Sequence, residues 1–207
     1  MDKSRRAGFT LIELMVTLSV AAILIAIAIP NIRNFLSNNR LSSGVNDLLH
    51  SIQVARTEAI KRQLLAPGAG VVVCGTTDPA AATATLTCTY NTFRGWFVFQ
   101  DTNGNWQRDA GEPVLETHTL IDASVTVKTD ANSDIVSFGP SGFANPAGAR
   151  VPTATLVMCD VRGVQAVGNN STGRALFISI TGRARASASY ADVHNTALPL
   201  VIGGSCP

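Results

Sequence analysis

Six side chains that carry oxygen atoms follow one another between two apolar segments. They are Asp101, Asn103, Asn105, Gln107, Asp109 and Glu112. Counted from Asp101, they occupy positions 1, 3, 5, 7, 9 and 12, the spacing with which a helix–loop–helix calcium site presents its ligands. Trp106 stands where such a loop has glycine, and no helix is expected on either side. The sequence therefore favours a polar hairpin at Asn103-Gly104 without a cofactor. The alternative is a calcium site made of Asp101, Asn103, Asn105, Asp109 and Glu112.

Two arginines near the end of the chain have a spacing that suits phosphate. In "ALFISITGRARAS", Leu176 and Ile178 hold even positions of a predicted strand, so even side chains face a core and odd ones face solvent. If the strand continues past Gly182, which can break the register, Arg183 and Arg185 lie side by side on the exposed face. Guanidinium groups suit phosphate because each presents several N–H donors. The competing interpretation is a protein contact or a solvated strand edge.

Charge is distributed unevenly along the chain, although the formal net charge is only +2. Residues 95–146 carry seven acidic side chains against two basic ones. Residues 147–207 carry two acidic side chains against five arginines, which are Arg150, Arg162, Arg174, Arg183 and Arg185. A neutral chain can therefore have two faces of opposite sign. If the basic face binds double-stranded DNA, we expect contacts through phosphates, without sequence preference and with strong salt dependence.

Residues that could catalyse a reaction are not grouped in the sequence. His50 lies in a predicted helix, and His118 and His194 have no catalytic motif around them. The four cysteines are Cys74, Cys88, Cys159 and Cys206. They include no C-x-x-C pair and no activating histidine motif, so neither a zinc site nor a reactive thiol is expected. Their even number fits two disulfides in an oxidising compartment, with three connectivities open. The sequence predicts a protein that is not an enzyme.

An apolar run, Phe9–Ile29, carries one charge, Glu13, and follows Lys3, Arg5 and Arg6. About 20 residues of helix cross a bilayer, so the run predicts one membrane span. The basic residues before it predict a cytoplasmic N-terminus and an exported remainder. A cleaved secretory signal is disfavoured because the run continues directly into more helix. A carboxylate in such a span usually has a functional partner, and the alternative is a protonated Glu13 near the headgroups.

The stretch "GFTLIELMV" resembles the processing signal of type IV pilins and type II secretion pseudopilins. The resemblance implies that a prepilin peptidase cuts between Gly8 and Phe9 and that Phe9 becomes N-methylated. Glu13 then matches the family glutamate that faces the amino terminus of a neighbouring subunit. An ion pair at low dielectric is favourable only when both charges are well placed, so Glu13 would set the register of assembly. Pro30 matches the proline that often follows the apolar run.

Later motifs resemble the GspH/FimT branch of these proteins. They are "ARTEAIKR" (55–62), "CGTTD" (74–78), "GWFVFQD" (95–101), "MCDVRG" (158–163) and "GRAR" (182–185). The last is similar to a motif of DNA-binding minor pilins that serve DNA uptake in competent bacteria. The resemblance implies a minor type IV pilin near the pilus tip that helps to prime assembly. A DNA-uptake receptor and a type II secretion pseudopilin are the alternatives.

The resemblance also implies partners, a location and a disulfide pattern. The partners are other minor and major pilins, the prepilin peptidase, the inner-membrane assembly platform and, for a receptor, DNA. The location is the inner membrane with a periplasmic domain, and then the pilus at the cell surface. The implied disulfides are Cys74–Cys88 and Cys159–Cys206. The second would close a loop of 46 intervening residues, which the chain-entropy model values at roughly 3–4 kcal/mol.

These residues must be positioned by a long helix and a β-rich domain. One buried helix face is predicted by the spacing of Leu41, Val45, Leu48, Ile52, Ala55 and Ala59. "LAPGAG" then ends the helix, and short β-rich runs alternate with turn signals after it. The predicted fold is α+β, a pilin-like long N-terminal helix packed on a C-terminal antiparallel β-domain. Its parts are a leader (1–8), a membrane and filament-core helix (9–30), an amphipathic helix (31–63) and a β-rich domain (70–207).

Overall fold

A single long helix, α1 (Leu11–Arg62), begins the described part of the chain. The computed structural model describes residues 9–89, 92–119, 122, 124–129, 135–144 and 154–194. Its contacts divide the chain into two units, one ending at Asn39 and the other beginning at Arg40. The helix therefore contributes to both units.

In the first unit, α1 runs through Pro30 without interruption. Proline removes one helical hydrogen bond, and the sequence predicts a kink or local melting at this point. The helix does not melt at this proline, since the turns before and after it remain helical. The side-chain amide of Asn31 donates to the Ile27 carbonyl oxygen at 3.3 Å. By length and composition the segment is apolar enough to cross a membrane, and its side chains are exposed in the described part of the chain.

In the second unit, one face of α1 is buried. All six side chains of the predicted stripe are inaccessible to solvent, which confirms that prediction. The helix ends at Arg62, and Gln63 takes a left-handed φ of 49°. The Gln63 side-chain amide donates to the carbonyl oxygens of Ile60 and Pro140, so the end of the helix is tied to a loop of the β-domain.

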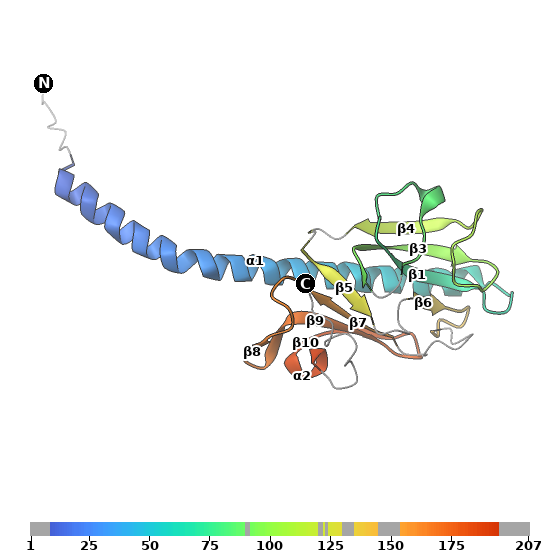
Figure 1. The fold of residues 1–207 in the computed structure, drawn as a ribbon. Helices are drawn as coiled ribbons and strands as arrows, with labels where there is room; N and C mark the ends of the chain where they lie inside the picture. Colours follow the sequence, from blue (N-terminus) through green and yellow to red (C-terminus); the bar gives the residue numbers. More distant parts are fainter. Residues whose placement is uncertain are drawn as a thin grey trace, which may run out of the picture. The chain divides into compact units, whose positions relative to one another are not determined.

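Two antiparallel sheets make up the rest of this unit (Figure 1). The first has the order β4-β3-β1-β6, with β4 at Val114–Thr119, β3 at Gly95–Asp101, β1 at Gly70–Thr76 and β6 at Ile135–Phe138. The second has the order β10-β9-β7-β5-β2, with β10 at Ala184–Ser189, β9 at Asn170–Ile178, β7 at Ala154–Cys159, β5 at Thr126–Thr129 and β2 at Thr92–Phe93. The short β8 (Ala166–Val167) pairs with β9, and a 3-10 turn, η1 (Thr83–Thr85), and a short helix, α2 (Tyr190–Val193), complete the fold. The predicted α+β class with a long N-terminal helix and an antiparallel β-domain is confirmed.

The main core joins the buried face of α1 to side chains from both sheets. Val71 and Trp96 come from the first sheet, and Val127 and Leu176 come from the second. Trp96 is almost fully buried, and its Nε1–H donates to the Ser51 hydroxyl at 2.9 Å. A buried donor without a partner is costly, so this bond fixes the helix relative to β3.

Among the β-rich runs that the sequence predicts as strands are residues 84–90, 174–181 and 197–203, and these three have different outcomes. The run "ATLTCTY" (84–90) is not a strand where the structure describes it, since η1 and an irregular segment occupy residues 83–89. Its large apolar side chain, Leu86, packs over β1 and β3 instead of continuing a ladder. The strand predicted at 174–181 ends at Ile178, where a tight turn begins. The run "ALPLVIG" (197–203) lies outside the described residues.

Candidate functional site

The candidate assembly residue Glu13 lies in the first turn of α1. Thr10 immediately precedes the helix, and the Glu13 backbone N–H donates to the Thr10 hydroxyl at 3.3 Å. Thr-x-x-Glu at a helix start is the capping-box spacing, in which the two residues satisfy free N–H groups of the first turn. This signal was readable in the sequence and was missed there. The pairing of Glu13 with a neighbouring subunit remains a prediction, and Gly8 lies outside the described residues.

The surface around Glu13 is apolar and open. Phe9 is 79% exposed and Leu11 is 76% exposed. Further along the same helix, large apolar side chains stay exposed as far as Phe35 and Leu36. A contiguous apolar surface of this kind marks contact with lipid or with other proteins. The arrangement suits a helix that is covered by a bilayer or by neighbouring helices.

The two candidate DNA-binding arginines lie on a hairpin, so the strand does not continue past Gly182, the residue that the sequence indicates as a possible break. After β9 the chain turns at residues 179–183, where the Ser179 N–H donates to the Arg183 carbonyl oxygen at 2.9 Å. Gly182 has a φ of 74°, and a Cβ there would lie 2.3 Å from the Gly142 carbonyl oxygen. Only glycine tolerates this turn, so the strand reverses and β10 returns beside β9.

Arg183 and Arg185 are both exposed, but their surroundings differ. Arg185 lies over the Phe177 ring, 4.2 Å from its centroid, and donates to Asp192 at 3.1 Å. Asp192 also accepts a hydrogen bond from the Ser187 hydroxyl. The pKa of Asp192 is lowered first by this Ser187 bond and then by Arg185. Arg185 therefore has an acidic partner that the sequence did not reveal.

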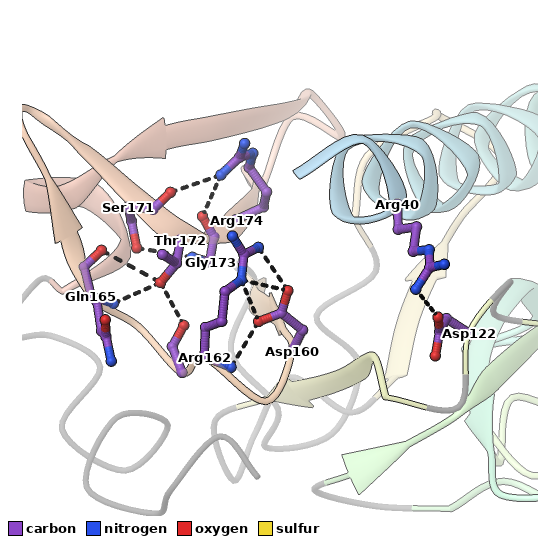
Figure 2. A network of polar contacts seen from close by, with 10 residues as sticks. Arg40, Asp122, Asp160, Arg162, Gln165, Ser171, Thr172, Gly173 and Arg174 are labelled. Atoms are coloured by element: carbon purple, nitrogen blue, oxygen red, sulfur yellow. Dashed lines mark hydrogen bonds and ion pairs between the residues drawn. The ribbon is translucent and has the colours of Figure 1, made fainter. Parts of the chain in front are cut away.

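Arg162 and Arg174 are brought together at the other end of β9, whereas Arg150 lies outside the described residues. Arg162 binds the buried carboxylate of Asp160 through two nitrogens, with the shortest contact at 2.7 Å. Arg174 donates to the carbonyl oxygens of Ser171 and Gly173 (Figure 2). The structure thus places the four candidate arginines that it describes in separate settings and not on one uniform face.

The loop of candidate calcium ligands uses its oxygen atoms on its own backbone. Asp101 is fully buried and accepts the N–H groups of Asn103, Gly104 and Trp106. Glu112 accepts hydrogen bonds from Thr102 N–H, Thr102 hydroxyl and Asp109 N–H.

The remaining candidate ligands contact one another. The side-chain amides of Asn103 and Asn105 both donate to Asp109 at 2.7 Å. Trp106 takes a left-handed φ of 58° where a calcium loop has glycine. Within the described ranges, no three His, Cys, Asp or Glu side chains are placed to hold a metal ion. The geometry is that of a hairpin shaped by side-chain to backbone bonds.

The cysteines have a structural role in the described part of the chain. Cys74 in β1 and Cys88 form a disulfide that holds residues 77–89 against β1. Cys159 is buried at the end of β7 and is disulfide-bonded. The partner predicted for it, Cys206, lies outside the described residues.

Comparisons with known proteins find relatives for both parts of the chain. The family model for the type II transport protein GspH matches residues 44–182, and that for the prokaryotic N-terminal methylation motif matches residues 3–29. The pilin-like protein PilA1 of Thermus thermophilus is 29% identical over 180 residues, which cover 82% of this chain and 97% of PilA1. The crystal structure of the type IV minor pilin FimU of Pseudomonas aeruginosa aligns with a TM-score of 0.48 and 21% identity, covering 75% of this chain and 98% of FimU.

Proposed function

The chain belongs to the GspH family of type IV minor pilins and pseudopilins, and from this premise we propose that it is a minor subunit of a type IV pilus. Near the pilus tip it would help to prime assembly. The observation that carries the proposal is the exposed apolar surface of α1 up to Leu36, next to a domain that buries its own core. Such a helix needs lipid before assembly and neighbouring helices afterwards.

The proposed sequence of events begins in the inner membrane. The apolar segment of α1 is the anchor, with the N-terminus in the cytoplasm and the β-domain in the periplasm. A prepilin peptidase cuts between Gly8 and Phe9, and Phe9 is N-methylated. Glu13 then meets the new amino terminus of a neighbouring subunit, because a charge in an apolar filament core is tolerated only with a partner.

Substitutions of Glu13 test this proposal and separate charge from helix capping. Every substitution of Glu13 keeps the bond from its backbone N–H to the Thr10 hydroxyl. Glutamine removes the charge but keeps a side-chain oxygen that can accept the Thr10 N–H in a capping box, whereas alanine removes the charge and that oxygen. We expect Glu13→Gln and Glu13→Ala to be cleaved normally and to be equally depleted from pili. Immunoblots of sheared pili and of membranes measure the incorporated fraction.

Glu13→Asp is the matched control, because it keeps the carboxylate charge. If the pairing is correct, this variant should still be incorporated into pili in part. Normal incorporation of Glu13→Gln would leave capping as the only role of this residue. Normal incorporation of both neutral variants would contradict a role in assembly altogether.

The same features are compatible with a pseudopilin of a type II secretion system. The description of the matched family names type II transport. Deletion of the gene separates the two assignments. We expect loss of surface pili with normal protein secretion. Loss of secretion with normal pili would assign the chain to the secretion system.

A second candidate function, DNA binding for uptake, is favoured by the placement of Arg183 and Arg185. Both are exposed and stand two residues apart at the start of β10. Phosphate contacts of this kind give sequence-independent, salt-dependent binding. Asp192 competes with phosphate for Arg185, since it already contacts that guanidinium group.

Gel shifts with the full chain in neutral detergent test this second candidate. Arg183→Ala combined with Arg185→Ala should weaken binding of double-stranded DNA and lower the salt slope by about 2, since each lost phosphate contact removes about 0.9. Asp192→Asn should strengthen binding, because it frees Arg185. Arg94→Ala, which removes an exposed arginine elsewhere, should behave as the parent protein. If the parent gives no shift at low salt, DNA binding is excluded and the pilin proposal is untouched.

A further inference from the structure

Asp160, Arg162 and Arg174 form a charged cluster near the paired strands β7 and β9, with two positive charges against one negative charge. Asp160 is the carboxylate of this cluster, and it is only 4% exposed. Both of its oxygens accept from Arg162, through Nε and Nη2. In Figure 2 the dashed contacts of Asp160 run to Arg162 and none runs to Arg174. The charge of Asp160 is therefore matched by Arg162 alone.

Arg174 has no carboxylate of its own within the described ranges. Its Nη1 donates to two backbone carbonyl oxygens, those of Ser171 and Gly173, at 2.8 and 2.9 Å. A guanidinium group has five N–H donors, so Nε and Nη2 remain available. The pKa of Arg174 is lowered, first by burial and then by the charge of Arg162, while Asp160 acts in the opposite direction. Arg174 is thus a partly buried cation that no carboxylate contacts within the described ranges.

A hollow of about 310 Å³ opens beside Arg174. One wall is the start of the second half of α1, with Ser42, Val45 and Asn46. The opposite wall is the β10 segment 186–188. Ser42 and Asn46 carry neutral hydrogen-bond donors, and Asn46 is exposed, so it can turn toward a ligand.

The carboxylate of Asp192 in α2, the helix that follows β10, already has partners. It accepts hydrogen bonds from Arg185 and from Ser187, one of the residues that line the hollow. On the helix side, Asp47 is paired with His118 at 3.4 Å. Within the described ranges, neither carboxylate contacts Arg174, so the guanidinium group at the hollow has no acidic partner there.

We propose that Arg174 and this hollow form a binding site for one oxyanion group, a phosphate or a carboxylate. Arg174 supplies the charge, and Ser42 and Asn46 supply neutral donors. Charge-assisted hydrogen bonds to a guanidinium group are short and strong, and the partial burial of Arg174 strengthens them further. The site is separate from the exposed Arg183 and Arg185 pair and does not depend on DNA binding or on assembly.

Calorimetric titration of the full chain in neutral detergent tests the site. Inorganic phosphate and acetate are titrated separately, with chloride at matched ionic strength as the reference. We expect a saturable, one-site response, to phosphate alone if the site selects phosphate and to both anions if it accepts carboxylates. Arg174→Gln should weaken anion binding at least about ten-fold, because the loss of one hydrogen bond to a charged group typically changes a dissociation constant by this factor or more.

A second variant keeps the proposal testable if Arg174→Gln folds poorly. Asn46→Asp places a carboxylate at the hollow, so it should abolish the anion response and raise the melting temperature without added anion. Gln53→Glu adds the same charge at an exposed position of α1 and should bind phosphate as the parent does. The proposal is overturned if the parent responds to neither anion, or if Asn46→Asp responds like the parent.

Discussion

Asp101 organises the longest hairpin loop of the β-domain at the level of a single residue. Its carboxylate is buried and accepts three backbone N–H groups, at 3.2, 2.7 and 2.8 Å. These bonds hold Gly104 with a φ of 77°, where a Cβ would lie 2.6 Å from the Pro67 carbonyl oxygen. The loop therefore packs directly on the chain that leaves α1. One carboxylate thus couples the hairpin to the end of the helix.

Replacement of this carboxylate by an amide tests its role. Asp101→Asn keeps the size of the side chain but turns N–H donors toward backbone N–H groups, so we expect a loss of about 1–3 kcal/mol in the free energy of unfolding. Thermal unfolding of the full chain in detergent, followed by near-ultraviolet circular dichroism, measures this loss.

Asp109→Asn is the matched control, because Asp109 is exposed, and its effect should stay within about 0.5 kcal/mol. The parent protein should melt at the same temperature in calcium chloride and in EDTA, since Asp101 and Glu112 already accept backbone N–H groups. A rise in melting temperature with calcium would restore the calcium interpretation of this loop.

At the level of elements, α2 depends on its neighbours. A helix of four residues is too short to be stable alone. Val193 is fully buried, the Tyr190 N–H donates to the Asn169 carbonyl oxygen at 3.0 Å, and Asp192 contacts both Arg185 and Ser187 of β10. The contacts of Asp192 are stronger with a charged carboxylate than with a protonated one, which makes the attachment of α2 sensitive to acid.

The direction of this pH dependence follows from the lowered pKa of Asp192. A carboxyl whose folded pKa lies below its unfolded value of 3.8 stabilises the fold above that value. This stabilisation is lost as the pH falls through the lower, folded pKa. We expect the amide NMR signals of α2 to move in this acid range, and to move less in Asp192→Asn. An unchanged acid transition in that variant would assign it to another carboxyl.

At the level of the whole molecule, one helix serves two environments. Up to Leu36 its large apolar side chains are exposed, and from Leu41 onward its apolar face is buried in the β-domain. The first surface suits lipid or other helices, and the second suits a water-soluble domain. This change along one helix is what a subunit that moves from a membrane into a filament requires.

Local periodicity explains how much of this could be predicted. The buried face of α1 repeats every three or four residues, so each of its six members was identified from spacing alone. Most β-runs were found in the same way, because turn residues separate them. The segment 84–90 failed because its threonine-rich composition resembles a strand, while the Cys74–Cys88 disulfide and the burial of Leu86 hold it over β1 and β3.

Contacts between distant residues explain what could not be predicted. Nothing near Arg185 in the sequence indicates that Asp192 folds back onto it, or that Arg162 alone neutralises Asp160. The Ser51–Trp96 bond likewise depends on the register between α1 and β3. Such pairs follow from tertiary packing, and a periodic pattern carries no information about them.

The start of α1 has a consequence for the proteolytic step. The helix begins at Leu11, and the Thr10 carbonyl oxygen accepts the Leu14 N–H at 3.2 Å, so Thr10 is already part of the helical hydrogen-bond ladder and Phe9 precedes it. A protease that grips its substrate as an extended strand can then take hold of the Phe9 side of the proposed scissile bond without unwinding a turn. The ammonium group released there would lie at the positive end of the helix dipole, which is an unfavourable place for a cation. Under the proposed processing, the carboxylate of Glu13, within the first turn of the helix, would offset this unfavourable charge before a neighbouring subunit pairs with it.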